Sequence, residues 1–201
     1  MTVVRARFFD GVRQNPFGGR LSGAQVAGME SIFRGWGLHA KAADAQLAYV
    51  MATAFHETAK TMQPVRETLA LSDEEAVARL ERAYAAGRLP SVRRPYWRPD
   101  AEGKSWFGRG FVQLTHRRNY EAMSDLIGID LVAEPGLALR TDIAAKILID
   151  GMRVGMFTGW RLDMFFGRGK ADWVGARKIV NGTDRAELVA GYGQAFAAAL
   201  Y

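Results

Sequence analysis

Two glutamates ten residues apart, Glu57 and Glu67, are the side chains best suited to chemistry. Glu57 directly follows an apolar stretch with helical spacing, so we expect its carboxyl group to be partly desolvated. Desolvation raises the pKa of a carboxyl group and suits it to donate a proton near neutral pH. Pro64 prevents a regular helix from reaching Glu67, which we therefore expect on a loop facing Glu57 across a groove. Two carboxyl groups in this arrangement are the minimum equipment for hydrolysing a glycosidic bond.

The other residue types point away from other catalytic classes. His56 and Glu57 begin like a zinc-protease motif, but Lys60 stands where the second histidine of that motif belongs. The chain has three histidines and no cysteine, so a metal site has few ligands to draw on. No serine-hydrolase elbow and no dinucleotide-binding or phosphate-binding pattern is present. We therefore expect carboxylate chemistry in a polar cleft, with no metal and no other cofactor.

Composition predicts one domain with a sizeable core. The chain has 201 residues, of which 49% are hydrophobic, and packing alone must stabilise it because cysteine is absent. We expect residues 1–201 to form a single catalytic domain and a monomer, without a separate wall-binding module. No window approaches the roughly 18 unbroken apolar residues of a membrane span, and no secretory signal is visible. These features predict no stable membrane insertion and a protein kept in the cytoplasm until something else releases it.

The net charge of +6 predicts an attraction to polyanions. Nucleic acid is one such polyanion, but the sequence contains no recognised nucleic-acid module and no dense basic run, so we do not expect it as a partner. An anionic cell wall explains a modest positive charge equally well, and a solvated surface is the neutral alternative.

Hydrophobic spacing and capping residues predict a mainly α-helical fold with at most a small β-hairpin. A central helix from about residue 45 to 59, with Asp44 as its cap, is expected to carry Glu57. Residues 1–20 end in a turn cluster that contains Pro and Gly, and we expect them to be irregular. Further helices are expected to start at or near Ser22, Ser72, Arg118, Asp142, Asp172 and Arg185.

A long loop at residues 87–105 is expected to flank the cleft, because the segment combines Gly, Pro and many charges. Loops of this length inside a compact domain are usually functional or mobile. Its aromatic residues Tyr96 and Trp97 are either a stacking surface for a sugar or packing anchors.

The segment 106–120 carries further polar candidates. After a turn around Arg109 we expect a short extended stretch, in which Gln113 and Thr115 alternate with apolar positions. Alternate side chains of an extended stretch share one face, so both are expected to point into one cleft. Arg109 either pairs with a catalytic carboxylate or supports the loop.

Four motifs, in order along the chain, resemble glycoside hydrolase family 19, which contains plant-type chitinases and the chitinase-like lysozymes of phage endolysins. Two of them are AFHETAKTMQPVRE (54–67) and WFGRGFVQLTHRRNY (106–120). The others, GMRVGMFTG (151–159) and ARKIVNGTDRAELVAGY (176–192), resemble the phage-lysin branch in particular. The resemblance implies a lysozyme-like helical fold with two lobes around a substrate cleft. It also implies single-displacement hydrolysis with inversion.

The resemblance assigns the two carboxyl groups to roles. Glu57 matches the general acid of the family, which protonates the leaving glycosidic oxygen. Glu67 is our choice for the general base, because its spacing resembles the phage-lysin branch. The alternatives for the base are Glu74, Glu75, Asp100 and Glu102. For inversion, the two carboxyl groups should lie roughly 6.5–9.5 Å apart to admit a water.

The family pattern also matches Gln113, Thr115, Asn119 and, later in the chain, Asn181. It implies that the Thr115 hydroxyl helps to position the attacking water and that the amides bind N-acetyl or hydroxyl groups of the sugar. The structural alternative is that Gln113 and Asn119 tie loops together and that Asn181 is a turn residue. We expect His56 to be an orienting or structural hydrogen-bonding group.

Together these features predict an endolysin-type lysozyme or muramidase that cleaves β-1,4 bonds in the glycan strands of bacterial peptidoglycan. Such an enzyme would act in the periplasm and cell wall of a host after its release. A chitinase with the same acid and base is the alternative enzyme, and a non-catalytic glycan-binding protein is the alternative from another class. The sequence leaves open which bond is cut, which host is attacked and whether the origin is phage or bacterial.

Overall fold

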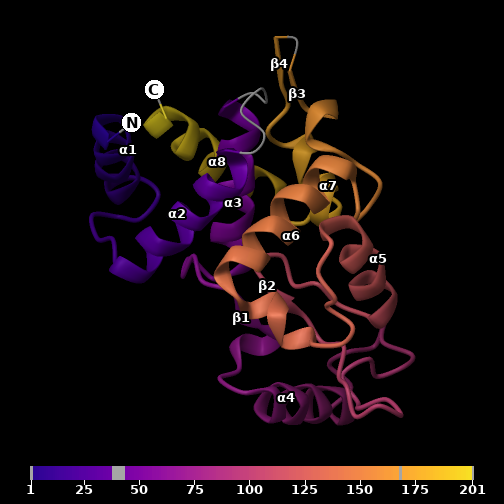
Figure 1. Cartoon of the computed structure of the whole chain (residues 1–201). Helices are drawn as coiled ribbons and strands as arrows, with labels where there is room; N and C mark the ends of the chain where they lie inside the picture. Colours follow the sequence, from indigo (N-terminus) through magenta and orange to yellow (C-terminus); the bar gives the residue numbers. More distant parts are fainter. Residues whose placement is uncertain (1, 38–43, 168, 201) are drawn as a thin grey trace.

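The computed structural model describes residues 2–37, 44–167 and 169–200, and this part of the chain is mainly helical (Figure 1). The α-helices are α1 (Thr2–Gln14), α2 (Gly23–Trp36), α3 (Asp44–Glu57), α4 (Asp73–Ala85), α5 (Arg117–Ile127), α6 (Thr141–Val154), α7 (Lys178–Asn181) and α8 (Ala186–Leu200). The strands pair as β1 (Val65–Arg66) with β2 (Arg109–Gly110) and β3 (Phe166–Gly167) with β4 (Lys170–Ala171), both antiparallel. The 3-10 helices are η2 (Glu67–Leu69), η3 (Pro135–Leu139), η4 (Leu162–Met164) and η5 (Gly175–Arg177). The mainly α-helical fold class is confirmed.

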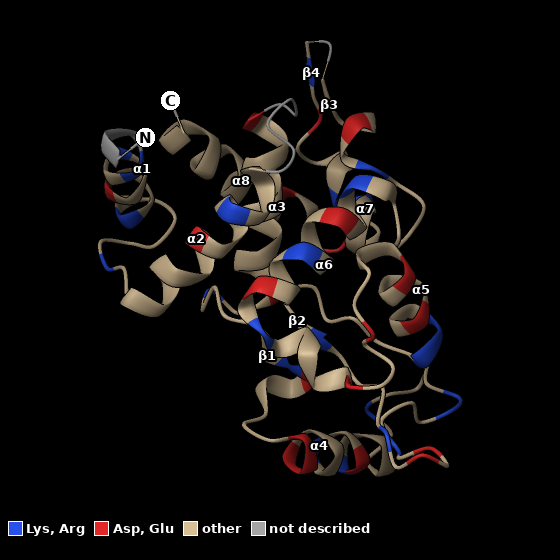
Figure 2. Ribbon diagram, viewed as in Figure 1, with Lys and Arg blue, Asp and Glu red and all other residues tan. Residues whose placement is uncertain are grey.

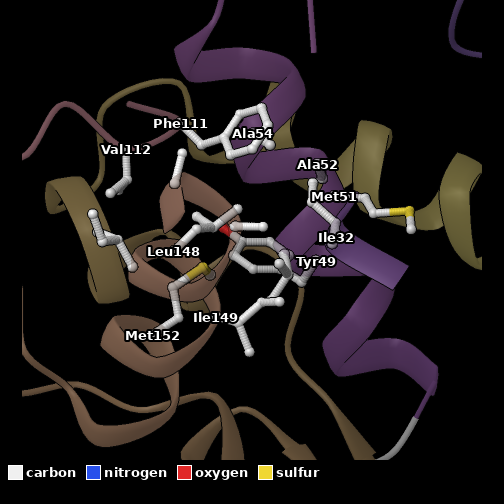
Figure 3. Close-up of a cluster of buried hydrophobic side chains, with 14 of the residues drawn as sticks. Ile32, Tyr49, Met51, Ala52, Ala54, Phe111, Val112, Leu148, Ile149 and Met152 are labelled. Carbon is white, nitrogen blue, oxygen red and sulfur yellow. The ribbon is translucent and has the colours of Figure 1, made fainter. Parts of the chain in front are cut away.

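Helix α3 lies at the centre of the main core. Every residue from 46 to 55 is buried, because α8, α2 and α6 all pack against this helix. Figure 3 shows the ring of Tyr49 on α3 beside Leu148 and Ile149 of α6, while Met51 on the same helix points away from them toward α8. A helix that is apolar on all sides is stable only when surrounded, so this packing fixes the position of the helix end that carries Glu57.

A second, smaller core lies around α4. It consists of Ala70, Ala76, Leu80, Trp97 and Phe107, which pack together apart from the main cluster. We call residues 70–107 the small lobe and the remainder of the described chain the large lobe. In Figure 1 the small lobe forms the lower end of the molecule, and the pair β1–β2 lies where it meets the large lobe. The predicted two-lobed arrangement therefore has a separate hydrophobic core in each lobe.

The expectation of an irregular segment at residues 1–20 was wrong, because residues 2–14 form α1. Phe8 and Val12, four positions apart, are both buried on one face of this helix. The ring of Phe8 lies edge-on to Phe33 of α2 and stacks at 6.4 Å on Phe196 of α8. Helix α1 is thus stabilised by tertiary packing against α2 and α8, a contribution that the local pattern does not reveal.

Most predicted helix starts are confirmed. Ser22 caps α2 in a capping box, since its side chain accepts from Gln25 N while the Gln25 side chain accepts from Ser22 N. Ser72 likewise caps the N-terminus of α4, since its side chain accepts a hydrogen bond from Glu75 N. The helix expected from Asp172 is instead a turn followed by η5 and α7. Residues 86–108 contain no helix or strand, and no helix in the described ranges is long and apolar enough to cross a membrane.

Candidate active site

Glu57 is the last residue of α3, and the backbone after it turns away sharply. Ala59 and Lys60 have φ values of 49° and 70°, so the helix cannot continue. Thr58 reinforces this end by donating its hydroxyl to Ala54 O at 2.7 Å. Because residues 46–55 of α3 are buried, the helix end holds the Glu57 carboxyl group at the edge of the main core.

Arg177 is the partner of Glu57, which the sequence analysis missed. Its Nη1 donates to Glu57 Oε1 at 2.7 Å, and its Nε donates to Asp184 O at 2.8 Å. The Arg177 side chain is only 2% exposed and that of Glu57 is 18% exposed. The two residues lie 120 positions apart, so no local signal in the sequence could have joined them. The guanidinium fixes the orientation of the candidate acid from the η5 side.

Two further side chains surround this ion pair. Burial holds the pKa of His56 below its usual value, and the positive charges of Arg177 and Arg185 lower it further. The negative charges of Glu57 and Asp184 oppose this shift without reversing it. His56 is therefore a neutral imidazole at neutral pH, which fits the expected orienting role better than that of a cation. Burial also raises the pKa of Tyr49, whose hydroxyl has no hydrogen-bond partner among the described residues.

Glu67 is held at the junction of the two lobes by the β1–β2 pair. Its backbone N donates to Gly108 O at 2.7 Å, while Gly108 N donates to its carboxylate Oε2 at 2.8 Å. The Tyr96 hydroxyl donates to the other carboxylate oxygen, Oε1, at 2.7 Å. Burial and this hydrogen bond raise the pKa of Tyr96, so the hydroxyl stays a donor. Tyr96 of the small lobe and Gly108 at the junction thus fix both oxygens of the candidate base in place.

The extended stretch predicted after Arg109 was wrong, because residues 111–113 form a tight turn. Arg109 and Leu114 close this turn by exchanging two backbone hydrogen bonds, at 2.9 and 3.2 Å. Gln113 lies at its end with a φ of 56°, a left-handed conformation. Alternation along a strand therefore does not explain how the predicted pair of polar side chains comes together.

Gln113 and Thr115 nevertheless lie together, over Gly108. An added Cβ at Gly108 would lie 2.8 Å from Gln113 Oε1 and 3.2 Å from Thr115 Oγ1. The Gln113 amide donates to Val65 O at 3.0 Å, and the Thr115 hydroxyl donates to Gln113 O at 2.7 Å. Since Gly108 N also binds Glu67, the turn places these two side chains next to the candidate base.

Asn119 and Asn181 occupy different settings. The Asn119 side chain donates to Thr115 O at 2.7 Å, so it ties the first turn of α5 to the turn before it. Asn181 ends α7 and is exposed, with its backbone oxygen accepting from Asp184 N at 3.3 Å. Asp184 also accepts from Arg177, which connects the Asn181 turn to the partner of Glu57.

Arg109 and Trp97 are structural residues: Arg109 pairs with Asp73 of the small lobe, and Trp97 is buried in the core of that lobe. Arg109 is 2% exposed, and its Nη2 donates to Asp73 Oδ2 at 2.7 Å rather than to either candidate catalytic carboxylate. Burial alone would raise the pKa of Asp73, but hydrogen bonds from Arg66 and Arg109 hold this pKa below its usual value. Trp97 is completely buried, with its Nε1 donating to Glu81 at 2.7 Å. Its ring therefore offers no face for stacking, and of the two readings the packing anchor holds.

The alternative carboxylates for the base belong to the outer network of the small lobe. Glu75 accepts from Leu71 N and Arg79, and Asp100 accepts from the indole of Trp106. Glu102 pairs with Arg117 and Lys104, and Glu74 lies exposed in the first turn of α4. A cavity of about 570 Å³ lies beside Glu74, between α4, residues 99–105 and η3, and neither Glu57 nor Glu67 lines it. In contrast to these alternatives, Glu67 is hydrogen-bonded to Gly108 N, next to Gln113 and Thr115.

Comparison with known proteins gives a family match over more than half of the chain. The model of the chitinase class I family, glycoside hydrolase family 19, matches residues 40–148. A rice protein (Oryza sativa subsp. japonica), Chitinase 11, is 42% identical over 40 residues, which is 20% of this chain and 16% of that protein. The matched part thus spans about one sixth of this relative's length. No solved structure matches significantly.

Proposed function

The chain belongs to the chitinase class I family of glycoside hydrolases, and from this premise we propose that it hydrolyses β-1,4 bonds in a glycan of N-acetylated sugars. One observation carries the proposal. Glu57 ends α3 in the main core, Glu67 lies at the junction with the small lobe, and each is held by partners of its own, Arg177 for the first and Tyr96 with Gly108 N for the second. A pair of fixed carboxyl groups is what an acid and base on opposite sides of a glycosidic bond require.

Glu57 is the general acid in this proposal. It gives its proton to the glycosidic oxygen as the bond to the sugar carbon breaks, and so becomes a carboxylate. The Arg177 guanidinium, which contacts Oε1 at 2.7 Å, stabilises the negative charge that develops. Because Arg177 is almost fully buried, it cannot turn away to solvent during this step.

Glu67 is the general base, and it takes a proton from the water that attacks the sugar carbon. A carboxylate accepts up to about four hydrogen bonds, so the bonds from Tyr96 and Gly108 N leave room for this water. The Thr115 hydroxyl uses its proton on Gln113 O, and its oxygen lone pairs are therefore available to accept from the same water. The roughly 6.5–9.5 Å separation expected for inversion stays a prediction.

We propose bacterial peptidoglycan as the substrate and cell lysis by an endolysin as the biological role. The positive net charge and the motifs at residues 151–159 and 176–192 support this choice over chitin. The family match and the 40-residue similarity to a rice chitinase favour chitin as the second candidate, since both polymers are β-1,4 chains of N-acetylated sugars.

Incubation with purified peptidoglycan and, in parallel, with colloidal chitin tests the proposal. Mass spectrometry of the released fragments identifies the new reducing ends, and a Glu57→Gln variant serves as the control. Peptidoglycan fragments with muramic-acid reducing ends, absent with the variant, are the expected result. Chitin oligomers alone would establish the chitinase instead. No fragments from either polymer would refute hydrolase activity.

A further inference from the structure

The loop that follows α4 carries a local excess of positive charge. Between Glu81 and Asp100 the sequence contains no acidic residue but has Arg82, Arg88, Arg93, Arg94 and Arg98. We call residues 88–94, with Arg88, Arg93 and Arg94, the arginine loop; all three side chains belong to exposed residues. Figure 2 shows this loop as a blue-marked segment beside α4.

These three arginines have no acidic partner among the residues that the structure describes. In the described ranges none of them forms an ion pair, whereas the neighbouring Arg98 pairs with Glu81 at 2.7 Å. The acidic residues at both ends of the segment are occupied, Glu81 by Arg98 and Trp97, and Asp100 by backbone donors and Trp106. An uncompensated cluster of guanidinium groups attracts carboxylates and binds them in a bidentate manner.

The arginine loop is connected to the candidate base through Tyr96, which follows Arg94 by two residues. The segment that follows the arginine loop is anchored by Trp97, which is buried in the core of the small lobe. In addition, Trp106 N donates to Tyr96 O at 3.0 Å. Tyr96 itself hydrogen-bonds Glu67. Since consecutive Cα atoms are about 3.8 Å apart, the Cα of Arg94 lies at most about 8 Å from that of Tyr96. The loop is therefore joined directly to the residue that holds the candidate base.

We propose that the arginine loop is a subsite for carboxylate groups carried by the glycan substrate, such as those on the stem peptides of peptidoglycan. This inference rests on the proposed function and deepens it, because chitin offers no carboxylates to the loop. The loop then selects charged strands over neutral ones at the same catalytic centre. Nucleic acid, the other polyanion that such a cluster attracts, is excluded or established by the same experiment.

The test compares two double variants that remove equal charge. Arg93→Gln with Arg94→Gln alters the loop, and Arg7→Gln with Arg20→Gln removes two exposed arginines that are unpaired within the described residues and lie far from Glu67 in the sequence. Both are made in the Glu57→Gln background, so that the substrate is not consumed. Binding to peptidoglycan sacculi, chitin and duplex DNA is measured by co-sedimentation and titration at low and high salt, and circular dichroism confirms folding.

The loop variant is expected to bind sacculi about three- to tenfold more weakly than the control variant at low salt. The difference should shrink at high salt, because exposed charges are screened, and the ratio of sacculus to chitin affinity should fall. Equal weakening by both variants would overturn the proposal, since net charge alone would then explain it. Loss of DNA binding without loss of sacculus binding would also overturn it. Hydrolysis by the wild type is measured separately, so failure of the proposed function is distinguished from failure of the subsite.

Discussion

Replacing Arg177 by methionine tests whether this residue holds the candidate acid. The change keeps much of the side-chain volume but removes two hydrogen bonds, to Glu57 Oε1 at 2.7 Å and to Asp184 O at 2.8 Å. A hydrogen bond involving a charged group contributes about 1.5–3 kcal/mol, and Glu57 is 18% exposed and so partly re-solvated when its partner is lost. We expect a loss of about 2–4 kcal/mol in the free energy of unfolding, equivalent to a Tm lowered by about 4–16 °C.

Catalysis should fall more than stability alone explains. Without the guanidinium, the Glu57 carboxyl group loses its fixed orientation, and misplacement of a catalytic group costs about a hundredfold in rate. Arg177→Lys keeps the positive charge, but a lysine ammonium group lacks the planar guanidinium geometry that bonds Glu57 and Asp184 O together, so an intermediate kcat is expected.

The measurements are urea denaturation and kcat on the preferred glycan, for folded variants at a temperature well below Tm. The matched control is Arg140→Met, because Arg140 pairs with Asp142 at the surface with side-chain exposures of 61% and 62%. It should change the unfolding free energy by less than about 1 kcal/mol. If Arg177→Met unfolds at the same denaturant concentration as this control and keeps its kcat, the assignment of Arg177 as the partner that positions Glu57 is refuted.

Three further predictions concern the small lobe and the junction. Gly108→Ala places a Cβ 2.8 Å from Gln113 Oε1, so it should lower the free energy of unfolding in urea by about 1–3 kcal/mol and remove most of the activity. In the control Gly136→Ala the added Cβ meets no atom within 4 Å, so stability and activity should both be unchanged. Trp97→Ala removes a fully buried indole and should lower the unfolding free energy by about 3–5 kcal/mol; an unchanged denaturation midpoint would contradict its anchoring role. Burial lowers the pKa of His116 in the folded state, so the unfolded state binds more protons below about pH 6.5 and stability should fall as pH decreases through that region. Denaturation of His116→Gln should show a shallower fall, and an identical pH dependence would count against this explanation.

The sequence was informative where a local pattern determines the structure. Ser22 and Ser72 indicate helix starts through capping chemistry, and the apolar run before Glu57 indicates the buried helix α3. Local patterns did not predict the structure where packing between segments distant in the sequence determines it. Helix α1 depends on contacts of Phe8 with α2 and α8, and the ion pair of Glu57 joins residues 120 positions apart.

The polar turn at the junction shows a third kind of limit. Gln113 and Thr115 were expected together because of strand alternation, but the backbone turns at residues 111–113 and Gln113 adopts a φ of 56°. Glutamine rarely adopts a backbone conformation with positive φ, so the residues of this segment do not indicate the turn. The two side chains lie together because both pack over Gly108.

The anomeric configuration of the first product tests the central claim, that Glu57 and Glu67 act as acid and base in a single displacement. Proton NMR during the first minutes of hydrolysis of a β-1,4-linked oligosaccharide of N-acetylated sugars distinguishes the anomers before mutarotation mixes them. The account predicts the α-anomer, because a water activated by Glu67 attacks from the face opposite the bond that Glu57 protonates. The β-anomer as first product would mean retention of configuration and would contradict these roles for the two glutamates.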